Sequence, residues 1–327
     1  MLRLPALDFH QPASLAEALV LLGQHGSDAR PVSGGTDLLP NLKLGQTRAG
    51  HLVSLRRLGE LQGIERVGDV LHLGAGVRLA ELAEDDDVRA WLPALAYAAS
   101  RIASPQIRNM ATLGGNLCLD TRCRYINQSD LWREALGGCL KSHGSECHVV
   151  PGGQGCVAAL SSDNVPPLVA YDAQVDIAGP GGLRALDVAD LYDTDGLAHV
   201  RLQPGEVLTQ VRVPIPGPGV RVAYRKWAVR KSIDFPLVSV AVRLETDGAV
   251  LLGGKVVVGV LGPKPRILTL EKLAGSALDE ALARQLGHMA FARCRPLPNV
   301  PYDADYRRER LAIETKRAVL SLLQPAN

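Results

Sequence analysis

Four cysteines with wide, uneven spacing are the residues in this sequence best suited to chemistry. Five of the six cysteines fall within residues 118–156, and four of them follow the pattern Cys123-x15-Cys139-x7-Cys147-x8-Cys156. Four thiolates can hold either a tetrahedral zinc ion or a [4Fe–4S] cluster. Because these spacings exceed the short C-x2-C knuckles of zinc ribbons, they favour iron–sulfur, with zinc as the alternative.

The segment that carries these cysteines differs in texture from the rest of the chain. From Asp120 to Gly155 the apolar periodicity disappears, and Arg, Asn, Gly, Ser and Cys dominate. A loop of this length inside a compact domain is unusual, and a bound metal centre would explain it. The polarity of the segment argues against cysteines that merely fill a core. His143 and His148 lie in the same segment and are minor alternative ligands.

Two paired glycines could bind a phosphate. Gly34-Gly35 precedes Thr36, and about 80 residues later Thr112 precedes Gly114-Gly115. Because glycine lacks a Cβ, the backbone amides of such loops can approach an anion closely. We expect the two loops to lie on opposite sides of one pyrophosphate. Neither matches G-x-G-x-x-G or G-x-x-x-x-G-K-[ST], which disfavours a Rossmann or P-loop site.

Composition excludes several other classes of function. Lys and Arg total 36 against 34 for Asp and Glu, and aromatic residues make up 4% of the 327 residues, so nucleic acid is a poor partner. The sequence shows neither the apolar core of a signal peptide nor an apolar run long enough for a membrane span. We therefore expect a cytoplasmic protein. No Ser-His-Asp set, HExxH motif or carboxylate pair suggests catalytic residues that transform an organic substrate.

The elements around these motifs alternate between short strands and helices, which predicts an α+β fold. Ser14 to Glu17 reads as a capping box that opens a helix ending near Gly26. The sequence further predicts helices at 92–102, 167–173, 278–293 and 306–323, and strands at 70–74, 174–177, 206–216, 220–228, 238–244 and 250–258. The prolines that close the strand at 206–216 suggest a boundary between domains at 1–218 and 219–327.

The two glycine loops, Pro31–Leu38 and Ala111–Asn116, resemble the FAD loops of the flavoprotein (medium) subunits of the xanthine oxidase family. The stretch Ser104–Met110 and the C-terminal Ala304–Arg308 are similar as well. The resemblance implies a vanillyl-alcohol-oxidase-type FAD-binding domain, followed by a small α+β domain of the CO-dehydrogenase flavoprotein type. Most members pass from Gly-Gly-Asn to a short loop, whereas this chain inserts residues 120–158. That insertion resembles the one in the β subunits of 4-hydroxybenzoyl-CoA reductases, which carries an extra [4Fe–4S] cluster.

The resemblance also implies roles for individual residues. Asp163 matches the aspartate that follows the second FAD loop, and Leu208 and Lys226 match further flavin contacts. Ile102 stands where some relatives have an aromatic residue. The implied FAD-binding residues are Pro31, Val32, Ser33, Gly34, Gly35, Thr36, Asp37, Leu38, Ile102, Thr112, Leu113, Gly114, Gly115, Asn116, Asp163, Leu208 and Lys226. The implied cluster ligands are Cys123, Cys139, Cys147 and Cys156, whereas Cys118 would lie beside the flavin.

The function that follows is electron transfer. The resemblance implies a large molybdenum-cofactor subunit and a small [2Fe–2S] subunit as partners, in a dimer of heterotrimers. An external donor such as ferredoxin would supply electrons, and the molybdenum subunit would remove a phenolic hydroxyl from an aromatic acyl-CoA. Two alternatives remain open. One is the flavin subunit of a molybdenum hydroxylase acting on aldehydes, purines or N-heterocycles. The other is an FAD subunit with a structural zinc docking loop.

Overall fold

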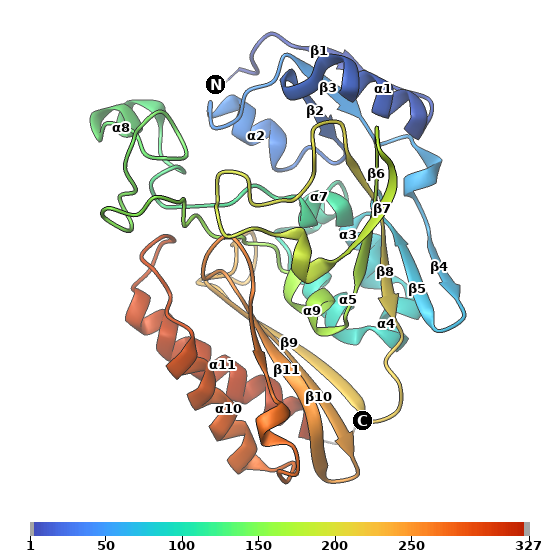
Figure 1. Ribbon diagram of the computed structural model, residues 1–327, viewed down its shortest axis with the longest axis vertical. Coiled ribbons are helices and arrows are strands. Elements are labelled where there is room, and N and C mark those ends of the chain that lie inside the picture. The colour runs from blue at the N-terminus through green and yellow to red at the C-terminus, as the bar shows by residue number, and fades with distance from the viewer. Residues whose placement is uncertain (1–2, 324–327) are drawn as a thin grey trace.

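Three separate sheets organise the chain, which a computed structural model describes over residues 3–323 (Figure 1). The ends of the two predicted domains, residues 1–2 and 324–327, lie outside the described residues. The first sheet belongs to an N-terminal lobe, the second to a central layer, and the third to a C-terminal domain. Helices and strands occur largely in separate runs along the chain, and this mixed content confirms the predicted α+β class.

The N-terminal lobe is a parallel sheet in the order β1-β3-β2. Its elements are β1 (Asp8–His10), α1 (Leu15–His25), β2 (Ala29–Val32), α2 (Leu38–Lys43) and β3 (His51–Ser54), with 3-10 turns at Gly26–Asp28 and Gly59–Leu61. Ser14 caps α1, because its Oγ accepts a hydrogen bond from the Glu17 amide at 3.2 Å. The helix ends at Gly26, which adopts a positive φ of 52°. Both ends of this helix were predicted from the sequence.

The central layer is an antiparallel sheet in the order β4-β5-β8-β6-β7. Its strands are β4 (Ile64–Val67), β5 (Val70–Gly74), β6 (Gln174–Gly179), β7 (Gly182–Asp187) and β8 (Val207–Pro214). The helices beside it are α3 (Leu79–Glu84), α4 (Asp86–Trp91), α5 (Pro93–Ser100), α6 (Pro105–Arg108), α7 (Leu113–Leu117) and α9 (Val165–Ala170), with a 3-10 turn at Val188–Leu191. Because β5 and β8 pair across more than 130 residues of sequence, the chain between them returns to the same sheet.

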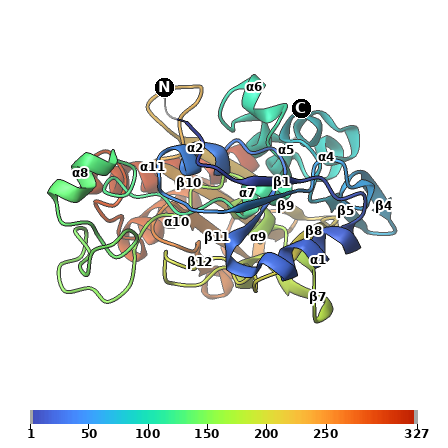
Figure 2. The same cartoon turned by 90° about the horizontal axis from the view of Figure 1, so that it is seen from above.

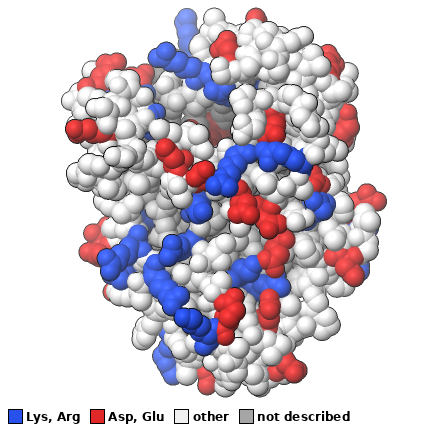
Figure 3. Space-filling view, in the orientation of Figure 1, with Lys and Arg blue, Asp and Glu red and all other residues white. Residues whose placement is uncertain are grey.

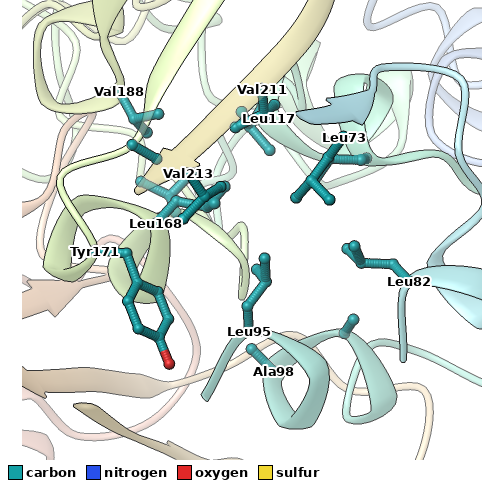
Figure 4. Packing of buried hydrophobic residues seen from close by; sticks show 14 of the residues in the cluster. Leu73, Leu82, Leu95, Ala98, Leu117, Leu168, Tyr171, Val188, Val211 and Val213 are labelled. Atoms are coloured by element: carbon teal, nitrogen blue, oxygen red, sulfur yellow. The ribbon is translucent and has the colours of Figure 1, made fainter. Parts of the chain in front are cut away.

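The largest apolar core lies between this sheet and its helices. In Figure 4, Val213 of β8 lies beside Leu168 of α9, and Val211 lies beside Leu117 of α7. These side chains are at most 4% exposed. The alternation of β8, whose residues Val207, Thr209, Val211 and Val213 are all buried, is that of a strand with one covered face. This packing fixes α7, which carries the second glycine loop, against the sheet.

The C-terminal domain packs two helices on one face of an antiparallel sheet in the order β12-β11-β10-β9 (Figures 1 and 2). Its elements are β9 (Val220–Trp227), β10 (Val238–Asp247), β11 (Val250–Gly259), β12 (Arg266–Thr269), α10 (Glu280–Arg293) and α11 (Ala304–Leu323), with a 3-10 turn at Glu271–Leu273. Each of the strands and helices predicted for this part is present, and its limits differ from the prediction by three residues or fewer. One face of this sheet forms a core of its own with the two helices, whereas the other face, with Tyr224, Ala241 and Val257, packs into the core of the central layer.

The inserted segment projects from the body between α7 and α9, and both ribbon views show it standing clear of the sheets (Figures 1 and 2). The prediction of a segment without structure was wrong in part, because α8 (Asp130–Ala135) forms within it, capped by Ser129. A pair of backbone hydrogen bonds between Arg122 and Ala159, at 2.8 and 2.6 Å, closes its base. The helix predicted at 167–173 begins earlier, at Val165, because Pro166 and Pro167 fit the first turn of a helix.

Among the described residues, no helix combines the length and the apolar character that a bilayer crossing requires.

Candidate functional site

A cavity of about 840 Å³ lies where the N-terminal lobe, α7 and the base of the inserted segment meet. Figure 3 shows the surface hollowed between the lobe at the top and the inserted segment at the upper left. On this face acidic and basic side chains are mixed, without a patch of one sign. A cavity of this size falls within the range of ordinary small-molecule sites.

The structure brings most of the predicted flavin residues to this cavity. Its wall includes Pro31, Val32, Ser33, Gly34, Gly35, Thr36, Asp37, Leu38, Ile102, Thr112, Gly115, Asn116 and Asp163. Four predicted residues do not line it, namely Leu113, Gly114, Leu208 and Lys226. Leu113 and Leu208 belong to the apolar core, and Gly114 packs on Ala75. Lys226 lies behind Asp163 rather than at the wall.

The first glycine loop offers free hydrogen-bond donors. Within residues 3–323, the backbone amides of Gly34, Gly35 and Thr36 donate to no protein acceptor. Gly35 has a positive φ of 68°, which L side chains rarely adopt. A Cβ added to Gly34 would lie 2.0 Å from the carbonyl oxygen of Met110. A glycine at position 34 is therefore needed for the close contact between the two loops. This packing requirement is separate from the approach to a phosphate that was expected from the sequence.

The second glycine loop lines the same cavity but is built differently. Its amides are already used: Gly114 donates to Ala75 O at 2.8 Å, and Gly115 to Thr112 Oγ1 at 3.3 Å. Asn116 accepts a hydrogen bond from Ser162 at 2.7 Å. This loop therefore presents side chains and a bare glycine surface to the cavity, whereas the first loop presents amides.

A half-buried ion pair lines the cavity on the side of the inserted segment. Arg122 contacts the Asp37 carboxylate, and its guanidinium lies over the Phe235 ring at 3.9 Å. Burial raises the pKa of Asp37, and the neighbouring Arg122 opposes that rise. Arg122 was not predicted. Its place was invisible in the sequence because the partners stand 85 residues before it and 113 residues after it.

Asp163 is held from behind by the C-terminal domain. Its carboxylate accepts hydrogen bonds from Lys226 Nζ at 2.9 Å and from the Tyr224 hydroxyl at 2.5 Å. Lys226 also donates to the carbonyl oxygen of Arg101 at 3.0 Å. Burial raises the pKa of Asp163, and Lys226 and Tyr224 act against it. The two predicted residues Asp163 and Lys226 are thus bonded to each other. Lys226 and Tyr224 on β9 hold Asp163 in position at the cavity wall.

All four predicted ligand cysteines line a second, small cavity inside the inserted segment. Cys123, Cys147 and Cys156 are buried, and Cys139 is partly exposed. The backbone pairing at Arg122 and Ala159 brings the first and last of them to the same base. Ile126, Val149 and Ala158 surround the sulfurs, which corrects the expectation that this segment is too polar for buried cysteines.

The sulfurs of this cavity receive hydrogen bonds from the chain. The amide of Ala158 donates to Cys156 Sγ at 3.5 Å, and the Ser142 hydroxyl to Cys139 Sγ at 3.8 Å. Burial raises the pKa of Cys123 to about 11, although backbone amides of Tyr125 and Ile126 donate to it. Such N–H donors are the protein's usual means of stabilising thiolates around a metal centre.

The spacing of the sulfurs does not suit a single zinc ion. Four thiolates on zinc stand about 3.8 Å apart, the edge of a tetrahedron with Zn–S bonds of about 2.3 Å. Among the described residues, no three of the four sulfurs lie within 4.8 Å of one another. A four-iron cluster is larger and holds its thiolates farther apart. The donor set and the cavity therefore fit the cluster better than the ion. His148 borders this cavity, and His143 is exposed.

Lys141 touches both cavities, a role that the sequence did not indicate. It follows Cys139 by two residues and lines the cysteine cavity as well as the larger one. Its Nζ donates to Asp120 at 2.6 Å, Thr121 at 2.5 Å and Gly196 O at 2.7 Å. Cys118 lines the larger cavity and not the cysteine one, as predicted, and burial raises its pKa to about 12.

Comparison with known proteins agrees with this arrangement. The family model of the FAD binding domain in molybdopterin dehydrogenase matches residues 5–216, and that of the CO dehydrogenase flavoprotein C-terminal domain matches residues 223–322. The carbon monoxide dehydrogenase medium chain of Hydrogenophaga pseudoflava is 30% identical over 319 residues, which cover 96% of each chain. The FAD-binding subunit of an aldehyde oxidoreductase from Escherichia coli is 36% identical over 271 residues, 80% of this chain and 83% of that one.

Solved structures extend the match to the whole fold. Reconstituted CO dehydrogenase from Oligotropha carboxidovorans superimposes with a TM-score of 0.80 at 27% identity, covering 99% of this chain and 100% of the other. Quinoline 2-oxidoreductase from Pseudomonas putida 86 gives a TM-score of 0.78 at 25% identity, covering 98% of each chain. The chain therefore belongs to the FAD-binding medium subunits of the molybdenum hydroxylase family and is an oxidoreductase subunit whose flavin transfers electrons.

Proposed function

We propose that this chain carries a [4Fe–4S] cluster beside its FAD and serves a molybdenum-containing reductase similar to 4-hydroxybenzoyl-CoA reductase. The observation that carries the proposal is the convergence of Cys123, Cys139, Cys147 and Cys156 on one cavity. Their sulfurs accept hydrogen bonds and stand too far apart for one zinc ion. The thiols are unpaired, which suits a reducing compartment such as the cytoplasm.

The cavity wall suggests how FAD is held. We assign the pyrophosphate to the free amides of Gly34, Gly35 and Thr36, because backbone N–H groups pair well with phosphate oxygens. Thr112 and Asn116 face it from the second loop. Asp163, held by Lys226, contributes a fixed polar group to the same wall. Bound FAD exchanges electrons in pairs or singly, which suits a position between one-electron centres.

The proposed partners are a large molybdenum-cofactor subunit and a small [2Fe–2S] subunit, arranged as a dimer of heterotrimers. An external donor such as ferredoxin would deliver electrons at the inserted segment, which projects from the body and remains accessible (Figure 1). The molybdenum subunit would use them to remove a phenolic hydroxyl from an aromatic acyl-CoA. In this scheme the present chain supplies binding sites and a path, and its residues do not touch the organic substrate.

A second candidate is the flavin subunit of a molybdenum hydroxylase that acts on aldehydes, purines or N-heterocycles. The proteins similar to this chain favour this second candidate, because they include an aldehyde oxidoreductase, a xanthine dehydrogenase and a quinoline oxidoreductase. Under this reading electrons leave the flavin through the cysteine segment instead of entering there. A zinc ion in that segment, used for docking, is the third candidate.

Metal analysis of matched complexes separates these candidates. The native complex is purified with the wild-type chain and with Cys139→Ser, and iron, acid-labile sulfide and zinc are measured per FAD. We expect the variant to hold about four fewer iron atoms and four fewer sulfides. Loss of one zinc with no change in iron would establish the docking reading instead. Equal metal contents would refute a metal centre in this segment. Reduction of 4-hydroxybenzoyl-CoA by a low-potential donor, compared with dye-linked oxidation of aldehydes or purines, then assigns the direction.

A further inference from the structure

Three histidines from three different elements converge in the N-terminal lobe, away from both cavities described above. His10 ends β1, His25 ends α1 and His51 begins β3. One ring nitrogen of each lies within 4.8 Å of those of the other two. All three are half-buried. The chain has eight histidines, so more than a third of them meet at this point.

The parallel sheet explains how they meet. His51 pairs with Asp8 in the ladder between β3 and β1. Because side chains alternate along a strand, His10 points to the same face as Asp8, two residues earlier. The last turn of α1 then places His25 on this face, with its ring stacked on that of His51 at a centroid distance of 3.6 Å. His51 at the start of β3 thus contacts both His10 at the end of β1 and His25 at the end of α1.

The distance between two of the nitrogens is that of a metal site. His10 Nε2 and His51 Nδ1 are 3.1 Å apart. Two imidazoles that bind one zinc ion at about 2.0–2.1 Å have nitrogens about 3.0–3.4 Å apart. His25 reaches the same point by rotation of its ring, since its nearest nitrogen already lies within 4.8 Å.

The charge around the cluster also favours a cation. The Asp8 carboxylate lies 3.6 Å from His51 Nδ1, and with its side chain 76% exposed it is free to turn toward a fourth ligand position. Asp28 binds the amide of Gly50, next to His51, at 2.8 Å. Three neutral imidazoles and a carboxylate form a donor set typical of zinc and related divalent ions.

We propose that His10, His25 and His51, with Asp8, form a binding site for a divalent transition-metal ion such as Zn²⁺. His51 pairs with Ala29 at the amino-terminal end of β2, and the loop Ser33–Thr36 follows the carboxyl-terminal end of the same strand. Four residues of β2 separate the two, about 13 Å at roughly 3.3 Å per residue. The ion therefore stands apart from the flavin cavity and stabilises the lobe that carries its first loop.

The competing explanation is a stack of neutral imidazoles joined by the hydrogen bond between His10 and His51. Such a stack needs no ion, and it predicts that zinc adds nothing to stability. A bound ion instead stabilises the folded state in proportion to its affinity and concentration. Zinc-dependent stability that requires each of the three rings distinguishes the two.

The experiment uses the untagged full-length chain in its complex, stripped with EDTA and then titrated with Zn²⁺. His10→Gln, His25→Gln and His51→Gln are compared with the wild type and with His288→Gln, a change of an exposed histidine on α10. We expect the wild type and the His288→Gln control each to bind one equivalent of zinc at this site. Each of the three other variants should lose that equivalent, because it binds zinc at least about 10-fold more weakly. FAD content measured in parallel shows that each variant is folded.

Thermal unfolding provides the second measurement. Zn²⁺ should raise the unfolding temperature of the wild type and of His288→Gln, and leave that of the three variants unchanged. The same zinc stoichiometry in His25→Gln and the wild type, or a zinc effect on stability that all proteins share, would overturn the proposal. The cysteine segment does not confuse the outcome, because its ligands are unchanged in every protein compared.

Discussion

The Nζ atom of Lys141 lies 2.6 Å from Oδ1 of Asp120, and this ion pair joins the cysteine segment to the chain that leaves the second glycine loop. The lysine side chain is 9% exposed, so its charge is poorly screened by water. It lines both cavities and is the one Lys or Arg side chain, among the described residues, that the two linings share. A charge so placed should influence the electron affinity of any redox group bound on either side.

We predict that Lys141→Met lowers the reduction potential of the bound flavin by several tens of millivolts. In a medium of effective dielectric constant about 20, one charge is worth about 2 kcal/mol at a separation of about 8 Å. A reductive titration of the complex measures the shift. Lys141→Arg keeps the charge and should behave like the wild type, as should Lys264→Met, a change of an exposed lysine. A flavin potential in Lys141→Met equal to that of the wild type would show that the charge does not act on the flavin.

Cys118 and Cys123 are only five residues apart in the sequence, but their substitution should affect different cofactors. Cys123 lines the cysteine cavity, and Cys118 lines the larger one. We therefore expect Cys123→Ala to abolish the visible iron–sulfur absorption and keep FAD bound. Cys118→Ala should keep the cluster and at most disturb the flavin spectrum. Absorption spectra and the FAD-to-protein ratio of the two variants are the measurements, and the reverse pattern would show that the ligand assignment is wrong.

Two glycine substitutions should separate folding from flavin binding. A Cβ at Gly34 would meet Met110 O at 2.0 Å, whereas the nearest atom to a Cβ at Gly115 is Thr112 Oγ1 at 3.1 Å. Gly34→Ala should therefore destabilise even the flavin-free protein, by about 1–3 kcal/mol. Gly115→Ala should leave the flavin-free protein nearly as stable and mainly weaken FAD binding, because Gly115 faces the cavity. Denaturant unfolding without FAD, and FAD titration of both variants, test this difference.

His199 should make the protein less stable in acid. Burial lowers its pKa to about 4, and its Nε2 donates to Leu119 O at 2.9 Å. Because the unfolded histidine titrates near 6.5, the unfolded state binds more protons between pH 6.5 and pH 4. The stability that depends on neutral His199 is complete above about pH 6.5 and falls as the pH drops toward 4, by up to about 3 kcal/mol. His199→Gln retains a donor and should flatten this slope in unfolding measured from pH 7 to pH 4.

The sequence by itself was sufficient for the local elements and for the chemical types of the sites. Ser14 and Gly26 predicted the two ends of α1, because the capping hydrogen bond and the positive φ that end a helix depend on residues adjacent in the sequence. The spacing of the four cysteines indicated a metal centre, and the two Gly-Gly-containing loops indicated an anion site. The helix predicted at 167–173 begins two residues earlier and ends three residues earlier, at Val165–Ala170, because both prolines fit its first turn.

Only the tertiary structure decided which residues act together. Arg122 contacts Asp37, Lys226 contacts Asp163, and Lys141 contacts Asp120. These partners are 21 to 85 residues apart in the sequence, and no local pattern encodes such pairings. It also showed that the two glycine loops differ, since Ala75 O accepts from the Gly114 amide whereas Gly34 packs against Met110 O and keeps its amide free. Nor did the sequence reveal the meeting of His10, His25 and His51, because parallel strand register and the packing of α1 bring them to one face. Local propensity is set by neighbours along the chain, whereas a site is set by neighbours in space.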